Sequence, residues 1–289
     1  MLEKKQGLWG WIFIAPACLL IFVMSFYPMA QAFIMSLQSG MGGNMRFAGL
    51  KNYARLFQDE MFLTSVGNVL VYLVIQVPFM LFLALVLASI LNSERLKLKG
   101  LWRTFIFLPC AAALVSSALL FKSFFSVDGL VNILLLKLNI ISSPVSWLTH
   151  PVWAKFIIIL VITWRWTGYN TIFYLAGFQS IDTSVYEAAR LDGASPAQQF
   201  FRITLPLLRP IILLTAIMST NGTLQLFDEV QNITNGGPGI ATLSISQYIY
   251  KLSFQYNPQF GYAAAVSYMI LIMVALLSFV QMKIGDKKD

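Results

Sequence analysis

The stretch EAARLDGASPAQQFFRITLP, residues 187–206, is polar and charged, and it lies in a chain that is otherwise strongly apolar. Of the 289 residues, 58% are hydrophobic and 11% are charged, and the mean hydropathy is +0.72. A soluble domain carries about 25% charged residues, so this composition indicates an integral membrane protein. The quoted stretch is therefore expected to lie in water between two membrane spans.

Helix signals occur twice in and just before this stretch. Ser184 and Glu187 have the spacing of a capping box, and Gly193 is placed to end that helix in a left-handed turn. Ser195-Pro196-Ala197-Gln198 then repeats the start signal, with serine as the N-cap and proline at the first helical position. The sequence predicts two short, rigid helices, the first over 185–192.

Six apolar segments are long enough to span a bilayer as helices, for which about 20 residues are needed. They are 9–36, 67–91, 102–121, 156–178, 207–227 and 261–282. The apolar run of the first is too long for a signal peptide, so it is expected to be an uncleaved span. The predicted fold class is all-α: a polytopic membrane protein of one domain over 1–289, with the polar loop 179–206 between spans four and five. Pro206 is expected to break the chain before the fifth span.

Orientation follows from the positions of Lys and Arg, which favour cytoplasmic loops. With the N-terminus in the cytoplasm, the cytoplasmic segments hold 12 of the 20 basic residues and the longer outer loops hold 7. The remaining one, Arg165, lies inside a span. Both termini and the polar loop are therefore expected to be cytoplasmic. The net charge of +8 reflects this orientation and not a nucleic-acid surface, because the basic residues flank the spans.

The sequence offers no catalytic or metal-binding set. Cys18 and Cys110 both lie in apolar runs, as small buried hydrophobes do, and His150 is the single histidine. No nucleotide-binding motif is present in the sequence. We therefore expect no enzyme activity and no cofactor in this chain, so that any ATP would be used by another subunit.

A longer pattern joins the two predicted helices: E-A-A, three residues, Gly, nine residues, then I-x-L-P. Glu187-Ala188-Ala189, Gly193 and Ile203-Thr204-Leu205-Pro206 meet it in full. The chain thus resembles the inner-membrane permeases of binding-protein-dependent ABC importers, and within them the maltose and glycerol-3-phosphate sugar branch. The likeness covers essentially the whole chain and includes Trp164 with Gly168, 176–179, 235–239 and 260–264.

The resemblance implies a carbohydrate importer in a bacterial inner membrane, with this chain as half of the pathway. Its expected partners are a second permease subunit (as a heterodimer), two cytoplasmic ATPase subunits that hold ATP and Mg, and an extracytoplasmic solute-binding protein. The loop would dock on an ATPase, with Glu187 as the charged contact, Gly193 as the turn, and Ala188 and Ala189 as close-packing positions. Ile203, Leu205 and Pro206 complete the coupling set.

The resemblance also implies a sugar site on spans four and five. It maps to Trp164, Thr167, Gly168, Thr171, Ser219, Gly222, Thr223 and Leu226. In each span the spacing places these residues on one helical face. The alternative is that these small and polar groups serve helix packing.

Arg165 leaves three interpretations open. It could pair with Asp228 or Glu229, it could lie in a wet vestibule if the span boundary is misplaced, or it could bind an acidic sugar. The transported sugar is accordingly expected to be either neutral or acidic. The outer loop 228–260 is a candidate contact for the binding protein.

The rival function is an ion-coupled secondary transporter or channel. Such proteins usually show an internal repeat with broken helices, or carboxylates buried within spans. We find no such repeat, and the acidic residues fall in predicted loops.

Overall fold

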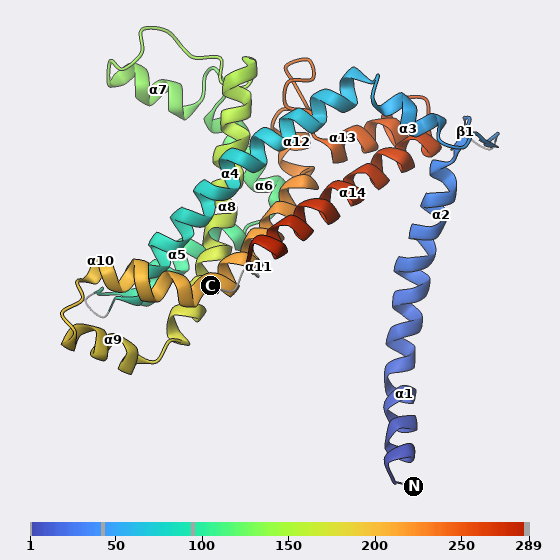
Figure 1. Ribbon diagram of the computed structural model, residues 1–289. Coiled ribbons are helices and arrows are strands. Elements are labelled where there is room, and N and C mark those ends of the chain that lie inside the picture. The colour runs from blue at the N-terminus through green and yellow to red at the C-terminus, as the bar shows by residue number, and fades with distance from the viewer. Residues whose placement is uncertain (1, 42–43, 94–95, 286–289) are drawn as a thin grey trace. The chain divides into compact units, whose positions relative to one another are not determined.

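The computed structural model describes residues 2–41, 44–93 and 96–285, with side chains from Gly10 onward (Figure 1). The chain divides into two compact units. One comprises Met1–Asp59 with Ile249–Met269, and the other comprises Glu60–Tyr248 with Ile270–Asp289. The single permease domain predicted over 1–289 stays a prediction.

Three long helices form the centre of the larger unit: α4 (Glu60–Asn92), α8 (Pro151–Gln179) and α11 (Leu205–Leu224). Small residues on α4, such as Ala84 and Ala88, are fully buried and allow α8 to pack closely beside it. Leu208 of α11 joins the same apolar cluster. The three helices are thus held together along the faces that their small and aliphatic residues share.

In the described part of the chain, five helical segments are long and apolar enough to cross a membrane. They are Gly10–Ser36, Glu60–Asn92, Pro151–Gln179, Pro196–Leu224 and Phe260–Gly285. Each contains or overlaps one of the predicted spans, with bounds extended by up to 11 residues because the helices continue past their apolar sections.

The third predicted span, 102–121, is not one straight helix. It consists of α5 (Lys99–Ala111) and α6 (Leu114–Phe124), which meet at an angle of 96°. Ala112 and Ala113 between them have extended backbone, so the helical hydrogen bonds stop there. The prediction of an unbroken helix was wrong, and the pair counts as a sixth span only as a broken one.

The polar loop forms two helices, α9 (Thr183–Leu191) and α10 (Pro196–Gln199), at the end of α8 opposite to α7 (Figure 1). The predicted capping box at Ser184 and Glu187 is wrong. The N-cap is Asp182, whose carboxylate accepts the Ser184 backbone N–H at 2.9 Å. The box at Ser195 is confirmed, since Ser195 and Gln198 exchange side-chain to backbone hydrogen bonds.

The expected break at Pro206 is also absent. A π-helical turn, Phe200–Thr204, connects α10 directly to α11, so that Pro196–Leu224 is one continuous helix. Proline lacks the N–H for the usual helical bond and crowds the carbonyl four residues earlier. The wider π turn just before Pro206 provides the local adjustment that lets the helix continue.

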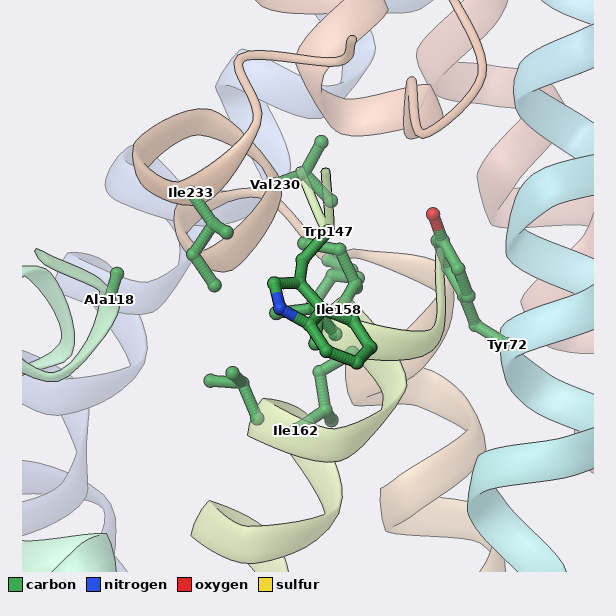
Figure 2. Close-up of a cluster of buried hydrophobic side chains, with 10 residues drawn as sticks. Tyr72, Ala118, Trp147, Ile158, Ile162, Val230 and Ile233 are labelled. Carbon is green, nitrogen blue, oxygen red and sulfur yellow. The ribbon is translucent and has the colours of Figure 1, made fainter. Parts of the chain in front are cut away.

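At the other end of the larger unit, α7 (Leu130–Lys137) and the chain after it fold back onto α8. The buried Asn132 holds this segment: its amide donates to the carbonyls of Val127 and Val145, and its oxygen accepts the Trp147 indole N–H at 3.0 Å. Figure 2 shows Trp147 among Ile158 and Ile162 of α8 and apolar side chains of α12 (Asp228–Ile233). This apolar cluster fixes α12 over the end of α8.

The segment after α12 is tied to α4. Asn68 donates to the carbonyls of Ile240 and Leu243, and the Tyr72 hydroxyl donates to that of Thr242. Helix α13 (Ile245–Tyr250) follows, with Gln247 fully buried. The chain between α11 and α13 is therefore a packed, hydrogen-bonded structure.

The smaller unit joins the N-terminal helices to the start of α14 (Phe260–Gly285). It contains α1 (Leu2–Ile21), a π turn over Phe22–Phe26, α2 (Tyr27–Ser36), the strand pair β1 (Gln38–Ser39) and β2 (Arg46–Phe47), and α3 (Lys51–Leu56). A π turn, Lys251–Gln255, precedes α14. Tyr262 donates to Asp59 at 2.6 Å, and the Arg55 guanidinium lies 3.9 Å from the centre of the Tyr262 ring.

Candidate functional sites

A cavity of about 530 Å³ lies in the larger unit, where α4, α8 and α11 meet the α5–α6 bend and α12. Its volume is within the usual range for small-molecule sites. Aromatic rings and uncharged polar groups line it together with aliphatic side chains. The polar and aromatic lining residues are Gln76, Trp166, Tyr169, Asn170, Thr215, Ser219, Thr223, Gln225, Phe227, Asp228 and Glu229.

The inner wall of this cavity is a polar contact between the three long helices. Gln76 of α4 accepts a hydrogen bond from Thr223 of α11 at 3.2 Å, and it donates to the sulfur of Met80. Asn170 of α8 lies 3.7 Å from the same sulfur. All four side chains are at most 4% exposed. Polar side chains at membrane depth are energetically costly, and those that occur there are functional candidates. This cluster is therefore a candidate binding surface.

Two adjacent carboxylates of α12 also line the cavity. Glu229 is buried and accepts a hydrogen bond from the Trp166 side chain. Burial raises the pKa of the Glu229 carboxyl, and the positive charge of Arg165 acts in the opposite direction. Asp228 is half-buried, and among the described residues no side chain pairs with its carboxylate.

The sugar-site residues predicted from the sequence fall in two places. The four on α11 and just after it, Ser219, Gly222, Thr223 and Leu226, all line the 530 Å³ cavity. Those on α8 do not. Gly168 and Thr171 line a second cavity of about 610 Å³ beside α5, together with Arg103 and Gln179.

The other two predicted α8 residues make packing contacts. Trp164 is 41% exposed and packs edge-on against Phe121 of α6, with ring centres 5.0 Å apart. Thr167 is buried and donates to the backbone carbonyl of Thr163. The α8 residues that face the first cavity are instead Ile162, Trp166, Tyr169 and Asn170. Assignment of the whole predicted set to a substrate path stays a prediction.

Gln76 and Met80 of α4 were missed by the sequence reasoning. A signal was available, because Gln76 is an amide in the middle of an apolar run and intramembrane polar groups are functional candidates. The resemblance drew attention to spans four and five, and the contribution of span two became visible only through the packing.

Gly168 is a contact point between α8 and α5. A Cβ atom there would lie 2.0 Å from the Ile106 carbonyl oxygen, so any side chain must push the two helices apart. We expect Gly168→Ala to lower the free energy of unfolding by roughly 1–3 kcal/mol, the usual range for overpacking. Gly67→Ala is the matched control, since a Cβ there meets nothing within 4 Å. Thermal unfolding of the purified protein in detergent measures both, and equal midpoints would contradict this packing.

Arg165 lies in the middle of α8 and is 7% exposed. Its guanidinium donates to three backbone carbonyls at the end of α5: Ala112 at 2.9 Å, and Pro109 and Cys110 at 3.4 Å. The last carbonyls of a helix lack intrahelical partners and carry a partial negative charge, so a cation is stabilising there. The ion pair with Asp228 or Glu229, one of the three interpretations of Arg165, is absent from the described residues, because both terminal nitrogens of Arg165 are directed at the α5–α6 break.

The coupling loop predicted from the sequence is a compact pair of helices. Glu187 and Ala188 are exposed on α9, whereas Ala189 is buried. Gly193 has φ of +77°, the left-handed conformation that was expected of it. Hydrogen bonding of the Asp182 carboxylate to the Ser184 backbone N–H holds the pKa of Asp182 below its usual value.

Side-chain contacts connect α9 to the start of the fifth span. The hydroxyl groups of Tyr186 and Thr204 lie 2.9 Å apart, and Thr204 is itself within the π turn. Leu205 and Phe200 pack against the apolar cluster at the ends of α4, α8 and α11. Pro206 is exposed and Ile203 is half-buried. Leu191, which the sequence reasoning missed, is 90% exposed at the end of α9.

Comparison with known proteins gives one consistent family. The profile described as "Binding-protein-dependent transport system inner membrane component" matches residues 62–284. The lactose transport system permease protein LacF of Rhizobium radiobacter is 52% identical over 97% of this chain and 95% of its own length. The arabinooligosaccharide permease protein AraP of Bacillus subtilis (strain 168) is 32% identical over 95% and 88%.

Among solved structures, a bacterial ABC transporter involved in the import of the acidic polysaccharide alginate matches with a TM-score of 0.87. The match covers 99% of this chain and 98% of that one, at 24% sequence identity. At this identity the similarity establishes the fold. The all-α membrane fold expected from the sequence is thereby confirmed.

Proposed function

Since the chain belongs to the family of binding-protein-dependent transport system inner membrane components, we propose how its helices and its polar loop divide the work of import. The chain is a permease subunit of an ATP-driven carbohydrate importer in the inner membrane, and it is not the ATPase. The secondary-transporter alternative is not favoured by these relatives. The polar loop would receive movement from the ATPase, and the cavity would carry the sugar.

The exposed face of α9 is proposed to dock on the ATPase subunit. Its apolar anchor would be Leu191. This side chain is 90% exposed on a capped helix, and burial of its apolar surface by a partner would favour binding. Glu187 would provide the charged contact and Gly193 the fixed turn. The hydrogen bond between Tyr186 and Thr204 would pass the motion to α11.

The 530 Å³ cavity is proposed as the sugar site of this subunit. Carbohydrate sites combine aromatic faces with hydrogen-bonding side chains, and here Trp166 and Tyr169 adjoin Gln76 and Asn170. The observation that carries this assignment is that Ser219, Gly222, Thr223 and Leu226 all line this cavity. Gly168 and Thr171, which line the second cavity, would face the second permease subunit.

The lactose permease protein at 52% identity makes lactose the first substrate to test. The working complex would contain a second permease subunit, two ATPase subunits that bind ATP and Mg, and an extracytoplasmic binding protein. With the loop facing the ATPase, both termini would be cytoplasmic, in agreement with the distribution of Lys and Arg.

The test is lactose uptake by the complete complex in proteoliposomes with the binding protein outside. We expect uptake that requires hydrolysable ATP inside the vesicles and that is unchanged by a protonophore. Uptake that is driven by a proton or sodium gradient without ATP would overturn the proposal in favour of a secondary transporter. Failure with lactose but success with another neutral disaccharide would correct only the identity of the sugar.

A further inference from the structure

The charged residues that line the 530 Å³ cavity are all acidic. Asp228 and Glu229 line it, and none of its lining residues, all in the described part of the chain, is Lys, Arg or His. Arg165 carries a positive charge that acts electrostatically on Glu229, but it is not a lining residue. A ligand inside the cavity therefore meets carboxylates and uncharged polar groups.

Arg165 is not among the residues that line this cavity, and its terminal donors are directed elsewhere, whereas its buried Nε has no hydrogen-bond partner among the described residues. Both terminal nitrogens of its guanidinium donate to the carbonyls at the end of α5. Removal of these bonds would leave three carbonyls without partners in a buried place, which is unfavourable. Arg103 of α5 does line a cavity, but it is the second cavity and not this one.

Asp228 is well placed to act on a ligand directly. Its carboxylate is half-buried at the cavity surface and has no ionic or side-chain partner among the described residues. An ionised carboxylate accepts hydrogen bonds and donates none, so sugar hydroxyl groups are suitable partners. A carboxylate, sulfonate or phosphate on the ligand would instead add a like charge at short distance in a site partly removed from water.

We propose that Asp228 and Glu229 make this cavity selective for uncharged carbohydrates and exclude acidic ones. The inference rests on the proposed function, since it names the substrate class of the same site. It separates this chain from the alginate importer, which shares its fold and imports an acidic polysaccharide. The presence of Arg165 in the sequence left open whether the sugar is neutral or acidic, and this proposal selects the neutral sugar.

The test uses three matched ligands: lactose, the derivative whose galactosyl C6 is a carboxylate, and the corresponding C6 carboxamide. The carboxamide has nearly the shape of the carboxylate without its charge. Binding to the complete permease–ATPase complex in nanodiscs, without the solute-binding protein, is measured by saturation-transfer NMR titration. We expect the carboxylate to bind at least tenfold more weakly than the carboxamide, and lactose to bind within about threefold of the carboxamide.

The double variant Asp228→Asn/Glu229→Gln should narrow the gap between carboxylate and carboxamide to less than threefold, since both replacements keep hydrogen-bonding capacity and remove charge. Asp128→Asn, in the exposed loop before α7, is the control and should leave the gap unchanged. Carboxylate binding equal to or tighter than carboxamide binding in the wild type overturns the proposal, whether or not the variants fold. A gap that persists in the double variant also overturns it.

The same series distinguishes the two levels of inference. If the neutral ligands bind and the carboxylate binds equally well, charge selection fails while the sugar site stands. If none of the neutral ligands binds, the sugar-site assignment fails together with the charge selection.

Discussion

Replacing Arg165 with leucine is expected to reduce sugar uptake by the reconstituted complex more than tenfold. The variant leaves the carbonyls of Pro109, Cys110 and Ala112 without donors, and each buried carbonyl without a partner costs about 1–3 kcal/mol. Cys110 and Leu114 on either side of the break line the 530 Å³ cavity. Loss of the arginine should therefore distort the site as well as weaken the packing.

Arg165→Lys should retain part of the activity. A lysine ammonium keeps the positive charge beside the end of α5 but cannot reproduce the planar fork that reaches three carbonyls. Lys155→Leu is the matched control, since it removes a basic residue of the same helix whose side chain donates to no carbonyl in the described part of the chain. Uptake is measured together with hydrogen exchange of the backbone around Ala112, which should become faster in Arg165→Leu. Wild-type uptake and exchange in Arg165→Leu would contradict the role assigned here.

Glu187→Arg and Gly193→Pro are expected to uncouple ATP hydrolysis from uptake while leaving the fold largely intact. Glu187 is exposed, so charge reversal changes the docking surface and little else. Gly193 has φ of +77°, which proline cannot adopt, so this variant should reorient α9 relative to α10. We expect uptake to fall more than tenfold in both, with ATP hydrolysis no longer stimulated by the loaded binding protein.

The control for the charge reversal is Asp128→Arg, an equally exposed carboxylate at the α7 end of the same unit. It should retain coupling, and thermal unfolding should show that all three variants are folded. Purified Glu187→Arg complexes with wild-type uptake would refute the docking proposal.

Local signals in the sequence predicted those features that depend on near neighbours along the chain. The capping box at Ser195 and the left-handed turn at Gly193 are of this kind, and so are the long apolar helices. The N-cap of α9 shows the limit of such signals. Asp182 and Ser184 are both good N-cap residues, and the S-x-x-E pattern favoured the wrong one.

Contacts between distant residues explain the larger differences. At the bend, the carbonyl of Ala112 accepts a hydrogen bond from Arg165, which lies 53 residues later and supplies donors that the interrupted helix lacks. Apolar composition alone is the same for a straight helix and for a broken one. The same limit applies to the three interpretations of Arg165: the ion pair with Asp228 or Glu229 is not formed, since the sequence shows those charges but not the free carbonyls of α5.

The sequence also could not show which face of α8 lines the 530 Å³ cavity. Two faces of this helix carry aromatic and polar residues, one with Trp164 and Thr171 and the other with Trp166 and Asn170. Trp166 and Asn170 line the first cavity, Thr171 lines the second, and Trp164 is partly exposed and lines neither. Periodicity identifies a face, and only the neighbouring helices decide what that face meets.

The unbroken helix from Pro196 to Leu224 makes α10, which follows the proposed docking helix α9, and one wall of the cavity parts of a single rigid body. Ser219 lies 23 residues from Pro196, or about 35 Å along the axis at 1.5 Å per residue. A push at α10 therefore reaches the cavity as translation or tilt of one rod. The rotation of one end of this helix relative to the other, about the helix axis, depends on the π turn at Phe200–Thr204. One added residue in a helical turn rotates all that follows by about 100°. Those five residues therefore set which side of the helix lines the cavity for a given orientation of α10.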